Sequence, residues 1–318
     1  MSKVGYFLSA EELAPDFLVS TARAAEAAGF DRIWVSDHYH PWTQEQGESG
    51  FVWAMLGAIA QTTSLHMTTA VTCPTDRIHP AILAQASATL ACLAPNRFTF
   101  GVGSGERLNE RILGGLWPPA EVRHERLEEA VNLIRKLWSG KTVTYRGTHY
   151  TVDAARIFSL PDALPDILIS GFGPKGAELA AHVGDGYMNV QPDADLVATY
   201  RDAGGKGLVQ GGLKFCWAES SDEAAKTAYR LWGFEGIGGQ SAQELPSWAE
   251  FEAIAEASSP EQVAEQVPCG PDPEPVVAAI KEYFDSGFDE VYVSQMGPDQ
   301  AGGLKFLAEE VLPLIDSS

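Results

Sequence analysis

The stretch Ile33-Trp-Val-Ser-Asp-His-Tyr-His-Pro-Trp42 joins a short apolar run to a dense group of polar and ring-bearing side chains. The apolar run, followed by a polar and Gly-containing segment, predicts the carboxyl end of a β-strand that enters a loop. Histidine titrates near neutral pH and suits proton transfer, while Asp37 is able to fix an imidazole tautomer and Trp42 to shield a flat ligand from water. Taken alone, the stretch is equally typical of a polar strand end closed by an ordinary aromatic residue.

A strand followed by a helix recurs along most of the chain. Runs rich in β-branched and aromatic residues predict eight strands, at residues 3–8, 31–36, 67–72, 97–102, 166–170, 186–190, 213–218 and 289–294. Apolar residues at helical spacing predict helices at residues 12–29, 51–63, 80–93, 120–138, 175–183, 194–203, 222–232, 273–286 and 302–315. Eight such units joined by right-handed crossovers predict an α/β fold, a (β/α)8 TIM barrel with insertions. A doubly wound open sheet is the alternative that the same order allows.

Two segments interrupt the alternation without indicating a second domain. Residues 139–162 are typical of a β-hairpin around Arg146-Gly147, and residues 233–271 combine glycines and prolines with short helical patterns. We therefore expect one domain over residues 1–318 with two insertions. Because catalytic groups of such barrels lie at the carboxyl ends of the strands, residues 36–42 become the first candidate site.

The composition is that of a globular protein with an unusual charge. The 318 residues are 45% hydrophobic and 20% charged, and 22 Lys and Arg stand against 43 Asp and Glu, a formal net charge of −21. This charge repels nucleic acids and anionic membranes, so we expect a small-molecule substrate and neither of those partners. No apolar run reaches the ~18 residues of a membrane span, and no signal segment is recognisable. The four cysteines lack CxxC spacing, so we expect reduced thiols and a cytoplasmic location.

Two further predicted strand ends carry loops suited to a ligand. In Gly101-Val-Gly-Ser-Gly-Glu106, alternating glycines let the backbone approach a ligand, and the final carboxyl group is able to exchange a proton. A dinucleotide fingerprint would require glycine in place of Glu106. In Ser170-Gly-Phe-Gly-Pro-Lys175, free amides at a helix start and the lysine suit a phosphate. Both loops are also compatible with simple βα turns.

Two other kinds of site are disfavoured. His38 and His40 would point the same way on an extended strand, but no second His or Cys pair is placed to complete a metal site, so we expect no metal. A Ser-His-Asp hydrolase is disfavoured because Ser104 is off centre in the glycine-rich loop and no Gly-x-Ser-x-Gly elbow results.

Four motifs spread over the chain form one pattern. They are Ser-Asp-His-Tyr-His-Pro-Trp at 36–42, Gly-Val-Gly-Ser-Gly-Glu-Arg-Leu-Asn at 101–109, Phe-Gly-Pro-Lys at 172–175 and Gly-Asp-Gly at 184–186. The pattern resembles the luciferase-like oxidoreductases of the bacterial luciferase superfamily, and more narrowly the branch of glucose-6-phosphate dehydrogenases dependent on coenzyme F420. The resemblance runs nearly end to end. It implies a usually dimeric α/β barrel that moves a hydride between a carbinol carbon and C5 of the deazaflavin.

The resemblance also assigns roles to residues. It implies that His38 is the base that removes the hydroxyl proton, that Trp42 lines the substrate side of the catalytic site, and that Glu106 protonates or hydrogen-bonds the deazaflavin near N1. Glu11 falls where a substrate-side carboxylate lies. The residues expected to contact coenzyme F420 are Asp37, Ala70, Val71, Ser104, Gly105, Asn109, Gly171, Phe172 and Gly173, with a non-proline cis peptide between Ala70 and Val71. One base for the hydroxyl proton and one acid near the cofactor suffice for this chemistry.

One departure from that branch concerns the substrate. The sugar-phosphate dehydrogenases hold phosphate with two lysines and an arginine, and ungapped matching puts Asp193, Ala253 and Gln266 at those places. A phosphate would lose charge-assisted hydrogen bonds worth about 1.5–3 kcal/mol each. We therefore predict a neutral sugar or alcohol, or the corresponding ketone or lactone, rather than glucose 6-phosphate.

Two other functions stay open at this point. An FMN-dependent luciferase-like monooxygenase on the same barrel would consume oxygen, whereas a deazaflavin enzyme would not. A catalytically silent barrel acting as a binding subunit is the other possibility. The complete set of His38, Trp42 and Glu106 favours the dehydrogenase over both.

Overall fold

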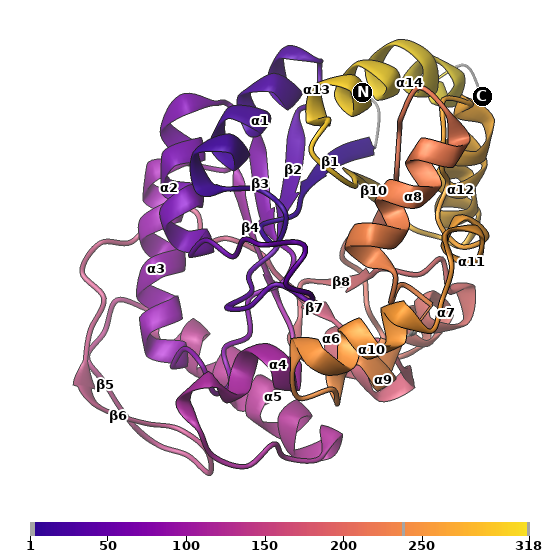
Figure 1. Ribbon diagram of the computed structural model, residues 1–318. Helices are drawn as coiled ribbons and strands as arrows, with labels where there is room; N and C mark the ends of the chain where they lie inside the picture. The colour runs from indigo at the N-terminus through magenta and orange to yellow at the C-terminus, as the bar shows by residue number, and fades with distance from the viewer. Residues whose placement is uncertain (1–3, 237–238, 317–318) are drawn as a thin grey trace.

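The computed structural model describes residues 4–236 and 239–316, and its centre is a closed barrel of eight strands (Figure 1). Each barrel strand pairs in parallel with both neighbours, in the order β1-β10-β9-β8-β7-β4-β3-β2. The strands are β1 (Val4–Leu8), β2 (Arg32–Val35), β3 (His66–Thr69), β4 (Phe98–Val102), β7 (Ile167–Ser170), β8 (Gly186–Asn189), β9 (Val209–Phe215) and β10 (Glu290–Gln295). The predicted TIM barrel is confirmed, and the closed ring excludes an open doubly wound sheet.

Helices surround the barrel, and several begin at residues that suit a helix start. They are α1 (Pro15–Ala27), α2 (Val52–Thr62), α3 (Pro80–Leu93), α4 (Arg107–Glu110), η1 (Arg111–Leu113), α5 (Ala120–Leu137), α6 (Pro174–Val183), α7 (Ala194–Asp202), α8 (Ser221–Trp232), α9 (Gly239–Gln243), α10 (Trp248–Glu256), α11 (Pro260–Ala264), α12 (Pro273–Asp285), α13 (Gln300–Phe306), η2 (Leu307–Val311) and α14 (Leu312–Asp316). Asp193, Ser220 and Asp272 cap the helices that follow them by accepting a backbone N–H bond. No helix in the described part of the chain is both long and apolar enough to cross a membrane.

The barrel interior is packed with side chains. Trp34 of β2 stacks on Tyr292 of β10 with ring centroids 4.7 Å apart, and its Nε1 donates to Gln210 of β9 at 3.0 Å. Gln210 in turn donates to Glu290 at 2.8 Å, so the buried polar groups of three strands satisfy one another. This layer closes the barrel and leaves the carboxyl ends of the strands as the floor of a site.

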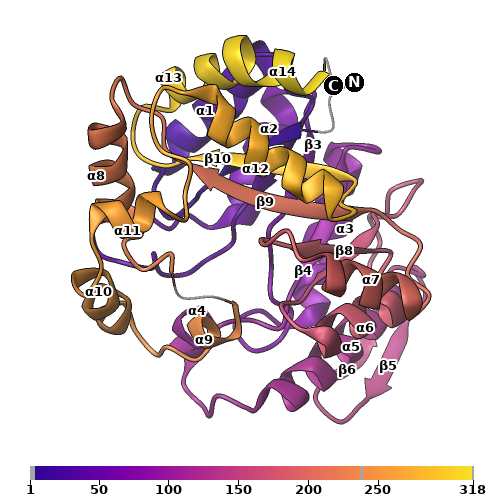
Figure 2. The same ribbon diagram turned by 90° about the vertical axis from the view of Figure 1, so that its right-hand side faces the viewer.

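The two interrupting segments lie on different sides of the barrel (Figures 1 and 2). Residues 139–162 contain the antiparallel hairpin β5 (Val143–Arg146) and β6 (Thr151–Ala155), and residues 233–271 contain α9, α10 and α11. Glu129 of α5 fixes the hairpin turn, because its carboxylate accepts from the backbone N–H groups of three successive residues, 148–150.

Four predicted elements differ from the observed ones by three residues or more, or in continuity. The strand expected at 67–72 is β3 and ends three residues earlier, at Thr69, before the cis peptide between Ala70 and Val71. The strand expected at 213–218 is β9 and begins four residues earlier, at Val209. The prediction missed this start because glycines such as Gly211 and Gly212 weaken a strand pattern. The helix expected at 12–29 begins only at Pro15, which is favoured in a first helical turn. The helix expected at 302–315 is divided by the π-helical turn η2, next to Pro313, which has no N–H to donate. Lys3, the first residue of the strand expected at 3–8, lies outside the described residues.

Candidate active site

A cavity of about 230 Å³ opens at the carboxyl ends of the barrel strands. All eight strands or the loops after them contribute to its wall, and the sequence segments around His38 and Glu106 meet there. Nine of the residues predicted for the catalytic, substrate or cofactor side line it: Glu11, His38, Trp42, Ala70, Val71, Ser104, Gly105, Glu106 and Phe172. The structure thus brings residues from five separate loops into one site.

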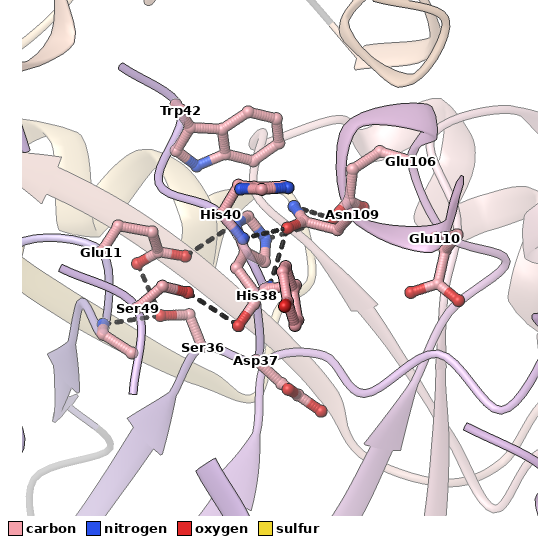
Figure 3. Close-up of polar contacts among 12 residues, drawn as sticks. Glu11, Ser36, Asp37, His38, His40, Trp42, Ser49, Glu106, Asn109 and Glu110 are labelled. Carbon is pink, nitrogen blue, oxygen red and sulfur yellow. Dashed lines mark hydrogen bonds and ion pairs between the residues drawn. The ribbon is translucent and has the colours of Figure 1, made fainter. Parts of the chain in front are cut away.

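His38 lies between two carboxylates (Figure 3). Its Nδ1 is 2.9 Å from Oε1 of Glu11, and its Nε2 is 3.3 Å from Oε1 of Glu106. The Glu11 contact pairs the buried Nδ1 directly with a carboxylate oxygen. Trp42 meets the imidazole edge-on, with ring centroids 4.6 Å apart, and so limits how the ring turns.

The charges of this group are coupled. Burial alone would lower the pKa of His38, but the carboxylates of Glu11 and Glu106 outweigh it and raise the pKa to about 9. Burial likewise opposes ionisation of Glu11, yet the charge of His38 and hydrogen bonds from His38, Ser36 and Ser9 lower the pKa of Glu11 to about 2. At neutral pH the centre is therefore an imidazolium held by ionised glutamate.

Glu11 is fixed by hydroxyl groups from two strand ends. Ser9 Oγ and Ser36 Oγ donate to its Oε2 at 2.8 and 2.7 Å, and the side chain is almost fully buried. Ser36 Oγ also accepts from the Ala10 N–H at 2.8 Å. The predicted substrate-side carboxylate therefore lines the cavity and at the same time sets the charge of His38.

Asn109 connects the loop of residues 38–40 to the loop that contains Glu106, on the side away from the cavity. Its Oδ1 accepts from the backbone N–H groups of Tyr39 and His40 at 2.8 and 2.7 Å, and its Nδ2 donates to Glu106 Oε1 at 2.9 Å. The side chain is fully buried and does not line the cavity. In this structure Asn109 positions the 38–40 segment against Glu106 rather than forming the wall itself.

Asp37 also lies behind the wall. Its carboxylate accepts from Thr72 Oγ1 at 2.6 Å and from Arg77 at 3.0 Å, and Figure 3 shows it directed away from Glu11 and Trp42. Arg77, which was not predicted as a site residue, also pairs with buried Glu110 at 3.3 Å. Burial raises the pKa of Glu110 to about 7, against the lowering effect of Arg77. No motif marks Arg77, because its partners come from two other loops.

The expected cofactor wall is partly present in the cavity. The peptide bond between Ala70 and Val71 is cis, as the resemblance predicts, and both residues line the cavity. Gly105 has a φ of +87°, and a Cβ there would lie 2.6 Å from Cγ of Glu110, so this position requires glycine.

The loop before α6 contributes only one of its three expected residues. Phe172 lines the cavity, whereas Gly171 packs against Gly176 and Gly173 precedes the first turn of α6. Lys175, expected near a phosphate, forms an exposed ion pair with Glu121 at 3.1 Å.

His40 is separate from this chemistry. Its ring contacts Tyr39, with centroids 4.9 Å apart, and it does not line the cavity. The described residues contain no group of three or more His, Cys, Asp or Glu side chains arranged to hold a metal ion.

A charged pair in the wall was not predicted. Lys214, near the end of β9, and Glu235, after α8, lie beside Trp232 and Phe234 at the Trp42 end of the cavity. The misplaced boundary of β9 concealed Lys214, because residue 214 is near the end of the observed strand but near the start of the predicted one.

The chain is similar to known proteins along nearly its whole length. The chain is 36% identical over 98% of its length to an F420-dependent glucose-6-phosphate dehydrogenase of Beutenbergia cavernae, covering 97% of that protein. It is 37% identical to an F420-dependent hydroxymycolic acid dehydrogenase of Mycobacterium tuberculosis, over 89% of this chain and 80% of the relative.

A solved structure is similar throughout. An F420-dependent secondary alcohol dehydrogenase in complex with an F420-acetone adduct superposes with a TM-score of 0.89 at 31% identity, over 97% of this chain and 98% of that one. The model of the luciferase-like monooxygenase family matches residues 1–290. With that match and relatives of this identity along nearly the whole chain, the protein belongs to the luciferase-like monooxygenase family.

Proposed function

We propose that this protein is an F420-dependent oxidoreductase that transfers a hydride between the carbinol carbon of a neutral alcohol or sugar, or the matching ketone or lactone, and coenzyme F420. The observation that carries the proposal is His38, held between Glu11 and Glu106 in a cavity that also contains the cis peptide 70–71. Relatives at 31–37% identity act with this cofactor on hydroxyl compounds, which supports the same reaction class.

The residues present fit such a cofactor. Ala70, Val71, Ser104, Gly105 and Glu106 all line the cavity. In our proposal the first four form the face against which the flat ring lies, with Glu106 at its edge. His38 Nε2 and the carboxylate of Glu106, 3.3 Å apart, are polar groups of the same cavity. When bound, the deazaflavin supplies a carbon that takes up or gives back a hydride. Asp37, Asn109 and residues 171–173 support this face from behind or beside it in our proposal.

The protein's own residues manage the proton. His38 accepts the hydroxyl proton in alcohol oxidation when its imidazole is neutral, and donates a proton to the carbonyl oxygen in the reverse direction when it is charged. Glu11 holds the imidazolium, and Glu106 is available to hydrogen-bond the cofactor ring. Trp42 excludes water from the substrate end and limits the orientation of His38.

The charges of the cavity support a neutral substrate in this proposal. None of the three positions matched to the phosphate-binding residues lines the cavity: Asp193 caps α7 by accepting from the Leu196 N–H at 3.0 Å, Ala253 lies in α10, and Gln266 follows α11. The support for a neutral substrate therefore comes from the lining residues themselves. Among the described lining residues, Lys214 is the only Lys or Arg, and Glu235 is paired with it. A phosphate dianion would meet the carboxylates of Glu11 and Glu106 without free cations to bind it.

Steady-state assays with coenzyme F420 test this proposal. We expect turnover of neutral secondary alcohols or sugars without oxygen uptake, and a kcat/KM for glucose 6-phosphate at least about tenfold lower, the loss of one charge-assisted hydrogen bond. Efficient turnover of glucose 6-phosphate and none of neutral substrates would contradict the substrate assignment. Oxygen uptake with FMN would support a monooxygenase instead.

We also infer that the protein is a cytoplasmic homodimer. The support is the family membership and the four cysteines, all of which are free. Light scattering of the purified protein should give twice the 34.2 kDa mass of the chain, and a monomer mass would refute the dimer.

A further inference from the structure

Lys214 and Glu235 form a closed ion pair in the cavity wall. Lys214 Nζ lies 2.9 and 3.1 Å from the two carboxylate oxygens of Glu235, and both side chains are about three-quarters buried. The ammonium group also lies 4.1 Å from the ring centroid of Trp232, over its face. The lysine is thus occupied from two sides and offers little to a ligand.

The indole that supports Lys214 is itself held in place. Trp232 Nε1 donates to Glu12 Oε1 at 2.7 Å, and the second oxygen of Glu12 accepts from the Gly297 N–H at 2.7 Å. Glu12 acts on Lys214 through space, but its oxygens already have donors. Without Glu235, the lysine would therefore have no equally placed carboxylate to bind.

Because Lys214 and Glu235 neutralise each other, the substrate end of the cavity has no free positive charge from Lys214. The described residues of the cavity wall include three carboxylates, of Glu11, Glu106 and Glu235, against one lysine and His38. An anionic ligand would have to displace Glu235 from Lys214 and leave that carboxylate unpaired in a partly buried place, which is costly. A neutral ligand leaves the pair intact and contacts Trp42, Trp232 and Phe234, the aromatic residues beside it.

We propose that Glu235 is a specificity-determining residue, which cancels the charge of Lys214 and so excludes carboxylate-bearing and other anionic substrates from the cavity. The inference rests on the proposed function only in placing the substrate at this end of the site. Removing the carboxylate turns Lys214 into a receptor for anions, and the restriction to neutral ligands is lost.

Calorimetric titration of the cofactor-free protein tests the inference with two matched pairs of probes. Each pair has a keto acid and a ketone in which an ethyl group replaces the carboxylate: pyruvate with 2-butanone, and levulinate with 2-hexanone. The Glu235→Gln variant frees Lys214, and the Glu235→Gln/Lys214→Met double variant removes the cation as well. Asp222→Asn is the matched control, because it frees Lys226 from an exposed ion pair on α8.

The parent protein should bind each neutral ketone more tightly than its keto acid. In Glu235→Gln, binding of the keto acid should strengthen relative to binding of its ketone by about tenfold or more for at least one pair. This factor corresponds to one charge-assisted hydrogen bond. The double variant should restore the discrimination, and Asp222→Asn should leave it unchanged. Glu235→Ala serves the same purpose if circular dichroism shows that the glutamine variant does not fold.

An unchanged ratio in a folded Glu235 variant, a shift that persists in the double variant, or tight binding of keto acids by the parent protein would each overturn the inference. Because no cofactor is present in these titrations, the result is independent of whether coenzyme F420 binds. Failure of the proposed function and failure of this inference are therefore separate outcomes.

Discussion

The protonation state of His38 determines what fraction of the enzyme is active in each direction of the reaction at a given pH. Two carboxylates offset the penalty of burial and raise its pKa to about 9. Below that pH the imidazolium is a proton donor, which suits reduction of a carbonyl group. The neutral ring that accepts a hydroxyl proton dominates only at higher pH.

The pH dependence of kcat/KM should show this charge. We expect alcohol oxidation to rise with pH through about 9 and carbonyl reduction to fall over the same range. Glu11→Gln removes one anionic neighbour, which lowers the pKa of His38 and moves both profiles to lower pH. Glu178→Gln, exposed on α6, should leave them in place. Superimposable profiles for Glu11→Gln and the parent would refute the coupling.

Arg77 is the residue that keeps two buried carboxylates paired behind the site. Arg77→Met leaves Asp37 and Glu110 without their cation, and we expect a loss of about 3–5 kcal/mol in the free energy of unfolding. Arg135→Met, which breaks an exposed pair with Asp185, should cost about 1 kcal/mol or less. Urea unfolding measures both. Equal losses in the two variants would show that the buried network contributes no special stability.

At the residue scale, the sequence predicts groups whose chemistry is local and misses those whose role depends on distant partners. His38 and Glu106 follow predicted strands and carry suitable side chains, so they are recognisable. Arg77 acts through Asp37, 40 residues away in sequence, and Glu110, 33 residues away. Such pairings become visible only once the strands are placed side by side.

At the scale of elements, β9 shows how packing overrides local preference. Gly211 and Gly212 weaken the strand pattern, yet a Cβ on them would lie 2.4 Å from Tyr283 Cδ1 and 2.6 Å from Trp34 Cζ3. Large aromatic side chains of other elements therefore occupy the space beside these glycines, and a residue with a side chain would not fit at either position. The sequence pattern alone places the strand too late for that reason.

Adding a methyl group to β9 should be costly. We expect Gly212→Ala to lower the free energy of unfolding by about 1–3 kcal/mol, because the Cβ displaces Trp34 from its packed position. Gly57→Ala in α2 is the matched control, since no atom lies within 4 Å of the added Cβ, and it should raise stability by about 0.4–1 kcal/mol. Chemical denaturation compares them, and a Gly212→Ala protein as stable as the parent would remove this explanation of the boundary.

For the whole molecule, the closed barrel explains why motifs far apart in sequence form one site. Parallel strands joined by crossover helices all end at the same edge, so loops after β1, β2 and β4 meet there. That closure is predictable from eight strand and helix units. The balance of charges in the cavity is not, because Lys214, Trp232 and Glu235 come from β9, the end of α8 and the segment after it.

The choice of cofactor is measured by titrating the purified protein with coenzyme F420 and, separately, with FMN, each followed by its own absorbance. We predict preferential binding of coenzyme F420, weakened in Glu106→Gln, whose side chain borders the proposed ring site. Preferential binding of FMN, or F420 binding that does not respond to Glu106→Gln, would contradict the assignment of the cofactor and the role of Glu106.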